Sequence, residues 1–537
     1  MSIFNQIDYF WHIIFTFYSK IMKNIFYFLS ITFIATSCGK SIDKNSFEGR
    51  VASYISQHQG SYMAFSMDLK NIIEKSGIEK GAIPEQYLNT IKPYMDALKA
   101  SINLEKQVFV IPTINTKNID QSEFLVLFDI KNADRLKKEF KEMGVSLKKK
   151  GNLEFGIKPD ATVGLFNGET GFILFSDGAM KVNEEMVVSM GKELAKGATI
   201  EGVVDFVTLK SDITAFYTGD KMSSIDFPDV PELSNITKSM NELYKGTYWI
   251  AQVSFEKQEA RMEIDIHFGD KLDEYAPFLR DKLSKEAVSV AASGSTFFAM
   301  AFNMDFGNFF NMIFEQLDQK TKDELNKQLS MLGGTDKFKQ LLTGEFAMAM
   351  SMPEEDLKFN VFAGTGDRKQ IQSMLDGFGF FLGITKSGDT YEMDGNLIEF
   401  TDKGIVIASS QADLKAIKSG NSPKSRKMGD FEFGAMPVSM FVDFGKMGAF
   451  ADYEELKYVT SVFDYAYFQS DGYKSFGLIR SFKSNQNILR TMIESAIEVQ
   501  RLEIIRVERE AREYEEMYDD IYFDEYSDEN TVESEDF

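Results

Sequence analysis

The sequence predicts an α+β fold in which a unit of largely antiparallel sheet and helices occurs twice, followed by a C-terminal helix and a disordered acidic tail. Three observations predict it. Segments recur in the same order about 230 residues apart, strand-like alternation surrounds glycine turns, and the C-terminus differs in composition. At 537 residues the chain is also too long for one ordinary core, so we expect two or more domains.

Five pairs of segments indicate a tandem duplication. The first pair is AFSMDLKNII (64–73) and AFNMDFGNFF (301–310), each a strand-like alternation that ends in Asp before a helical start. The other pairs are 127–144 with 361–379, 164–177 with 396–410, 213–222 with 438–447, and 247–268 with 461–482. Stretches such as YWIAQVSF and ARMEIDIHF alternate, which is typical of antiparallel strands with one covered face.

The C-terminus follows a different pattern. An apolar stripe at helical spacing predicts a helix that leaves the body when its later turns become charged; the stripe is Ile488, Met492, Ile493, Ala496 and Ile497. The last residues are acidic with interspersed Tyr and Phe, which favours a solvated, disordered tail. We therefore expect a leader (1–37, with Met22 as the true start), a lipidated tether (38–58), a first repeat (59–285), a second repeat (286–497), a protruding helix (498–517) and an acidic disordered tail (518–537).

The single cysteine of the chain, Cys38, follows an apolar run. From Met22, a basic Lys23 precedes about a dozen apolar residues and then the small residues Ala35 to Ser37, which is the layout of a secretory signal peptide. With cysteine directly behind them, the segment resembles a bacterial lipoprotein signal. That resemblance implies removal of the leader and lipidation of Cys38. A transmembrane helix over 9–38 is the alternative, but lysines interrupt the run.

Composition excludes several function classes. The formal net charge of −23 argues against nucleic acid and against docking on anionic lipid through surface charge. Three histidines and one cysteine leave too few ligands for an ordinary structural zinc site, and a Ser-His-Asp triad would need His58 or His267. We therefore predict no cofactor, no metal, no catalytic residue and no enzymatic activity.

Motifs that suggest chemistry have simpler structural interpretations. Asp68, Asp305 and Asp443 each follow a strand and precede a helix, where Asp is a preferred N-cap. DFG occurs at two of these sites without the other kinase motifs. FAGTGDRK (362–369) has Lys369 where a dinucleotide-binding loop needs its third glycine, so we interpret it as a tight turn before a helix.

The leader, YMAFSMDLKNIIEKSGI (62–78) and EKQVFVIP (105–112) together resemble the opening of the domain of unknown function 4836 family, lipoproteins of Bacteroidota. The resemblance covers roughly residues 50–500. It implies an envelope lipoprotein with a duplicated α+β body, and it implies no activity and no site residues.

The sequence thus predicts a non-enzymatic lipoprotein of the cell envelope that binds a protein or a polymer. Cys38 would hold it in the outer membrane. Surface export signals of the family it resembles are usually acidic after the cysteine, and GKSIDK has no acidic run, so we expect the protein to face the periplasm, with the cell surface as the alternative. One alternative is a glycan or peptide hydrolase with paired carboxylates, one of them with a raised pKa. Another is a carrier of an apolar ligand in a Phe/Met-lined cavity, since the chain has 49 Phe and 27 Met.

Overall fold

The computed structural model describes residues 42–527 with internal gaps. The gaps are residues 59, 114–122, 159–160, 177–181, 225–241, 275–278, 281, 292–294, 331–332, 353–356, 380–382, 420–426 and 449–452. The predicted leader, Cys38 and residues 528–537 lie outside the described residues.

Twenty strands of the described residues form one continuous sheet, in which every neighbouring pair is antiparallel. The strands of the first half are β1 (Met63–Met67), β2 (Val108–Thr113), β3 (Glu123–Asp129), β4 (Lys148–Lys150), β5 (Leu153–Ile157), β6 (Ala161–Phe166), β7 (Thr170–Ser176), β8 (Ile213–Thr218), β9 (Tyr248–Phe255) and β10 (Glu259–His267). Those of the second half are β11 (Thr296–Asn303), β12 (Leu342–Ser351), β13 (Lys358–Thr365), β14 (Thr385–Ser387), β15 (Thr390–Met393), β16 (Asn396–Phe400), β17 (Gly404–Ala408), β20 (Val438–Asp443), β21 (Phe463–Ser470) and β22 (Lys474–Ser481). A separate hairpin joins β18 (Lys427–Met428) and β19 (Phe431–Glu432).

The two halves share one strand order, which confirms the predicted duplication. The first half runs β4-β5-β6-β7-β3-β2-β1-β8-β9-β10. The second runs β14-β15-β16-β17-β13-β12-β11-β20-β21-β22, with each strand in the place of its counterpart. All five recurring segment pairs fall on equivalent elements, for example β1 with β11 and the β9–β10 hairpin with β21–β22.

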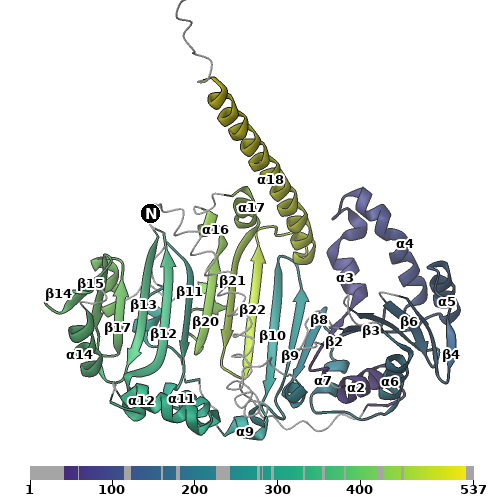
Figure 1. The fold of residues 1–537 in the computed structure, drawn as a ribbon, viewed down its shortest axis with the longest axis horizontal. Coiled ribbons are helices and arrows are strands. Elements are labelled where there is room, and N and C mark those ends of the chain that lie inside the picture. The colour runs from purple at the N-terminus through teal and green to yellow at the C-terminus, as the bar shows by residue number, and fades with distance from the viewer. Residues whose placement is uncertain are drawn as a thin grey trace, which may run out of the picture.

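The halves meet edge to edge where β10 pairs with β22 (Figure 1). Seven residue pairs form this join, from Glu259 opposite Arg480 to Asp265 opposite Lys474. The outer edges of the sheet are the three-residue strands β4 and β14. β4 consists of three exposed lysines, a composition that disfavours pairing with another chain.

Helices cover the sheet unevenly. The helices of the first half are α2 (Phe47–Gln57), α3 (Leu69–Ser76), α4 (Glu85–Ser101), α5 (Ala133–Glu142), α6 (Glu184–Ala195), α7 (Val203–Thr208) and α9 (Asp270–Asp273), with 3-10 turns at Ile78–Lys80 and Gly219–Ser224. Those of the second are α10 (Lys285–Ser289), α11 (Phe306–Gln316), α12 (Gln319–Leu329), α13 (Thr335–Leu341), α14 (Arg368–Phe378), α15 (Gln411–Ser419), α16 (Phe444–Met447), α17 (Glu454–Val462) and α18 (Ile488–Ser527).

We name the two faces of the sheet by what packs on them. The covered face carries the main cores, beneath α2, α6 and α7 in the first half and beneath α10 and α15 in the second. The hollow face is the opposite side. It is overlaid by α5 near one outer edge and by α14 near the other, by the start of α18 near the join, and by α9 and α11 at one end of the middle strands. This face is turned to the viewer in Figure 1.

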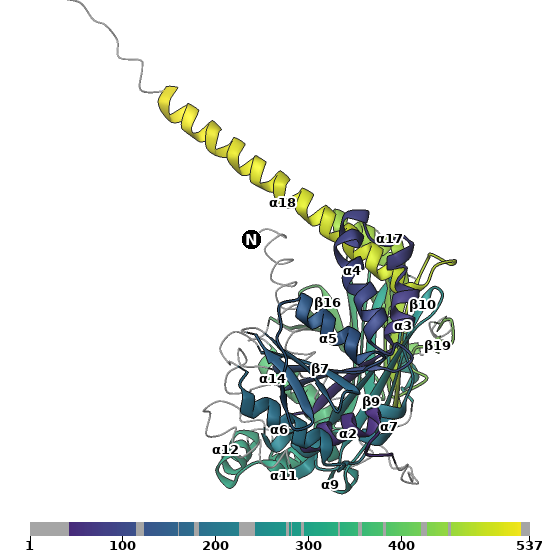
Figure 2. The ribbon, with the colours of Figure 1, turned by 90° about the vertical axis from the view of Figure 1, so that its right-hand side faces the viewer.

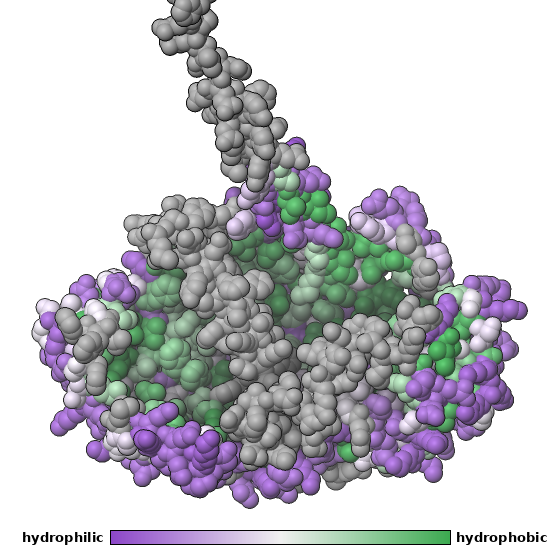
Figure 3. All heavy atoms as spheres, viewed as in Figure 1, coloured by the Kyte–Doolittle hydropathy of each residue, from purple (hydrophilic) through white to green (hydrophobic). Residues whose placement is uncertain are grey.

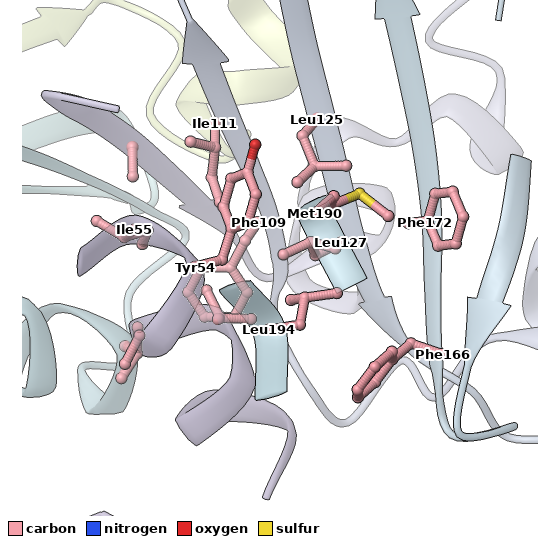
Figure 4. Packing of buried hydrophobic residues seen from close by; sticks show 14 of the residues in the cluster. Tyr54, Ile55, Phe109, Ile111, Leu125, Leu127, Phe166, Phe172, Met190 and Leu194 are labelled. Carbon is pink, nitrogen blue, oxygen red and sulfur yellow. The ribbon is translucent and has the colours of Figure 1, made fainter. Parts of the chain in front are cut away.

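The predicted tether is wrong in its second part, because residues 47–57 form α2 within the first core. Ser46 caps this helix by accepting a hydrogen bond from the Gly49 amide, and Phe47, Val51 and Ile55 are buried at helical spacing. Figure 4 shows Tyr54 and Ile55 packed among side chains of β2, β3 and α6. The first repeat therefore begins before residue 59.

The C-terminal helix begins at Ile488, as predicted, and leaves the body (Figure 2). Its end differs from the prediction, because α18 continues to Ser527, through the first half of the segment expected to be disordered. No Gly or Pro follows Ile488, and Tyr518 and Ile521 continue an apolar spacing, so the sequence has no helix breaker here.

Candidate functional site

A row of apolar side chains crosses the hollow face of the sheet. Residues directly opposite each other on neighbouring antiparallel strands point to the same side, so the pairing register traces the row from strand to strand. We call it the central row: Ile407, Val361, Met348, Met300, Met440, Phe468, Gly477, Met262, Val253, Ile213, Met67 and Val108. It runs from β17 to β2 and passes through the join between the halves.

The rows on either side of it are also apolar. One contains Phe359, Met350, Phe298, Val442, Ala466, Ile479, Ala260 and Phe255. The other contains Ala363, Phe346, Phe302, Val438, Ser470, Ser475, Ile264, Ala251, Ala215, Phe65 and Val110. Its two serines hydrogen bond to each other, with 2.9 Å between their Oγ atoms. None of the three rows contains a charged residue.

Local sequence explains why the central strands differ on their two faces. In β11 and β12, Met and Phe alternate with Ala, as in FFAMAF and FAMAM. The alanines point to the covered face, where Ala299, Ala301, Ala347 and Ala349 are fully or almost fully buried close to α10 and α15. The small residues let those helices approach the sheet, and the large adaptable side chains are left on the hollow face.

Several side chains of the hollow face are only partly buried, whereas Val108, Phe255 and Ala260 of the same rows are buried. Met300, Met348 and Phe468 are half-buried, while Met440 is 37% and Ile479 36% exposed. Near the outer edge of the first half, Phe124 and Phe175 are more than 40% exposed on this face. Figure 3 shows apolar residues gathered in a hollow within a hydrophilic rim, around β12 and β13 on the left and beside α3 on the right.

The three aspartates singled out in the sequence are N-caps, as predicted. Asp68, Asp305 and Asp443 each accept a hydrogen bond from the amide three residues later, at 2.9, 3.0 and 3.3 Å. The two DFG triplets are therefore starts of helices, α11 and α16.

The glycines of FAGTGDRK are required by close packing against neighbouring atoms. A Cβ on Gly364 would lie 2.1 Å from Thr343 Oγ1, and one on Gly366 would lie 2.1 Å from the carbonyl oxygen of Gln340. Asp367 then caps α14. This agrees with the prediction of a tight turn at a helix start.

Both described histidines contact glutamates. His58 Nδ1 lies 2.9 Å from Glu193 Oε2 and its ring stacks on Tyr54, which ties the end of α2 to α6. His267 Nε2 lies 3.2 Å from Glu201 Oε1, and its ring stacks on Tyr248. These pairs connect elements of the fold, and among the described residues no serine hydroxyl is found as a hydrogen-bonding partner of either ring.

Two carboxyl groups have raised pKa values because burial disfavours their charged form. Glu123 at the start of β3 lies near His58, which opposes the shift. Asp464 in β21 lies near Arg480, which also opposes it, and near Asp443, which adds to it. Asp443 already caps α16 and contacts Lys446 Nζ at 3.4 Å, so the Asp443–Asp464 pair is poorly placed for acid–base chemistry.

Within the described part of the chain, no group of three or more His, Cys, Asp or Glu is placed to hold a metal ion. None of the helices in that part is both long enough and apolar enough to cross a membrane. Cys38, the predicted lipidation site, lies outside the described residues.

Comparisons with known proteins add little. No family model matches the chain, and no curated protein matches it, so the resemblance to the domain of unknown function 4836 family stays a prediction. Among solved structures, crystal form I of TP0453 is 10% identical with a TM-score of 0.23, over 43% of this chain and 80% of that one. Crystal form III is 10% identical with a TM-score of 0.21, over 71% and 98%.

Proposed function

We propose that the chain is a non-enzymatic lipoprotein of the bacterial outer membrane that binds long hydrocarbon chains on the hollow face of its sheet. The observation that carries the proposal is the central row with its two neighbours, which join both halves in one apolar surface without a charged residue. Of the functions that the sequence leaves open, this favours the apolar-ligand carrier.

The chemistry of the rows favours hydrocarbon over a folded protein as the ligand. Protein interfaces make about one hydrogen bond per 100–200 Å², and so need donors and acceptors. The rows offer two hydroxyl groups, and Ser470 and Ser475 use these on each other. Methionine side chains adapt to ligands of varied shape. Each methylene transferred from water to such a surface gains about 0.8 kcal/mol.

The dimensions of the surface suit an acyl chain. Neighbouring strands lie about 4.8 Å apart, so the five spacings between β12 and β10 span about 24 Å. That distance is comparable with the length of a long extended acyl chain.

The anchor supports the same function. If Cys38 carries lipid, the eight residues 39–46 link it to Phe47, the first residue of α2. Eight fully extended residues span at most about 28 Å. We propose that this short tether keeps the sheet near the outer membrane, on its periplasmic side, where acyl chains are available.

The test is a binding titration of a fluorescent fatty acid to the purified Cys38→Ser chain, which has no lipid of its own. Affinity should rise with chain length from octanoate to palmitate, measured by displacement. Met440→Glu should weaken binding at least about tenfold, because it sets a charge against hydrocarbon. The matched control Met143→Glu changes a methionine that is 49% exposed at the end of α5 and should bind as the parent does. Equal binding by both variants, or no binding to the parent, would contradict the proposal.

A further inference from the structure

The long C-terminal helix carries a second apolar surface, separate from the hollow face. α18 has 40 residues and is therefore about 60 Å long. Its first turns pack on the sheet, where Ile488 is fully buried and Leu489 and Met492 contact the core around Phe255. From Val507 to Tyr514 every residue is exposed. Figures 1 and 2 both show this part leaving the body.

One side of the helix contacts α17. Val499, Leu502 and Arg506 are half-buried and follow one another at helical spacing. Arg506 fixes this side, since its Nε lies 2.8 Å from Glu455 Oε1 and its guanidinium lies over the ring of Tyr453. The remaining side of the helix points away from α17.

On that remaining side, apolar residues recur every three and four positions. Ile504 and Val507 are each 53% exposed, Ala511 is exposed, and Tyr514 is 63% exposed. The spacing 3-4-3 is that of positions a and d of a coiled coil, and Tyr518 and Ile521 continue it in the sequence. We call Ile504, Val507, Ala511 and Tyr514 the seam. An exposed apolar stripe of this period fits a facing helix.

Glutamates flank the seam on both sides. Counting Ile504 as position a, Glu503 and Glu510 occupy g and Glu508 occupies e, and all three are exposed. Glu510 also pairs with Arg506 at 3.1 Å, one turn back. The cations Arg506, Arg509 and Arg512 occupy the outer positions c, f and b. Positions e and g set the choice of partner in coiled coils, so the preferred partner is cationic there.

The same charges disfavour a second copy of this chain. In a parallel pair, Glu503 and Glu510 at g would face glutamates at e of the other helix, and an antiparallel pair would bring e to e and g to g. Either arrangement sets like charges against each other along the seam.

We propose that the seam of α18 binds an amphipathic helix of another protein, whose apolar stripe is flanked by lysine or arginine. This interaction goes beyond ligand binding on the hollow face and does not depend on it. The acidic helix projects from the body and so presents the seam to a partner at a distance from the sheet.

The test uses the full chain and two synthetic peptides of four heptads, both with Leu at a and d. One peptide has Lys at e and g, and the other has Glu. Fluorescence anisotropy should show the Lys peptide binding at least about tenfold more tightly, with affinity falling as salt rises. The triple variant Glu503→Lys, Glu508→Lys, Glu510→Lys should reverse this preference.

Because the whole chain is acidic, a variant that leaves its charge unchanged is the decisive control. Val507→Ser with Tyr514→Ser should lose at least about tenfold in affinity for the Lys peptide, while Ile505→Ser, at the outer position b and 38% exposed, should keep it. The proposal is overturned if the serine variant binds as the parent does, if charge reversal leaves the preference unchanged, or if the parent binds both peptides equally or not at all. It is also overturned if the chain alone forms dimers that the serine variant abolishes.

Discussion

Met300 in β11 and Met440 in β20 lie opposite each other in the central row. Both point to the hollow face, while their sequence neighbours Ala299 and Phe441 are completely buried on the covered face. Met440 keeps 37% of its surface exposed. Among the described residues, neither methionine belongs to a buried hydrophobic cluster, and this arrangement is the basis of the proposed ligand surface.

If α2 is part of the first core, Phe47→Ala should destabilise the protein by about 3–5 kcal/mol. Phe47 is 5% exposed and its ring lies 5.7 Å from that of Phe109. The measurement is the free energy of unfolding in urea. The neighbouring Glu48→Ala removes an ion pair with the partly exposed Lys106 and should cost less than about 1 kcal/mol. Similar small effects of both substitutions would mean that residues 47–57 belong to a tether after all.

The buried carboxyl of Glu123 should make the stability of the fold depend on pH. Burial raises the pKa of Glu123 above its ordinary value of 4.5, so the folded state holds this proton to a higher pH than the unfolded state. Above about pH 4.5 unfolding then releases a proton, and the contribution of Glu123 to stability falls as pH rises.

Glu123→Gln removes the pH-dependent contribution of this carboxyl to stability and changes the shape of the side chain little. The stability of the variant relative to the parent, measured by urea unfolding at several pH values between 4 and 7, should therefore increase with pH. A constant difference across that range would show that the carboxyl is not protonated preferentially in the folded state.

The anchor gives a further prediction. Cells grown with radioactive palmitate should incorporate label into the parent chain and into Ser37→Ala, which keeps a small residue before the cysteine. Cys38→Ser should incorporate none and should leave the membrane fraction. Label that persists in the serine variant would exclude Cys38 as the lipidated residue.

Repetition made the architecture predictable. Alternation in segments such as YWIAQVSF predicts antiparallel strands, and five recurring segments predict that one topology occurs twice. The join could not be predicted, because β10 and β22 alternate like any other strands and pairing between the halves leaves no local signal. α2 was missed because the lipoprotein signal suggested a tether, although Phe47, Val51 and Ile55 show helical spacing.

The apolar side chains of the hollow face leave a pattern in the sequence, but the overall amino-acid composition does not reveal it. Abundant Phe and Met fill cores in most proteins, whereas here the strict alternation with alanine in FFAMAF and FAMAM assigns them to one face. The sequence does not say whether that face is covered by helices. Only the placement of α10 and α15 on the alanine side distinguishes the two faces.

Ligand binding on the hollow face is tested most directly by locating a bound acyl chain. A fatty acid with a photoreactive group near its methyl end would be bound to the purified Cys38→Ser chain, irradiated, and mapped by peptide mass spectrometry. We expect labels on β11, β20 and β21, at or beside Met300, Met440 and Phe468, and loss of these labels in Met440→Glu. Labels confined to other elements, or unchanged by that substitution, would contradict it.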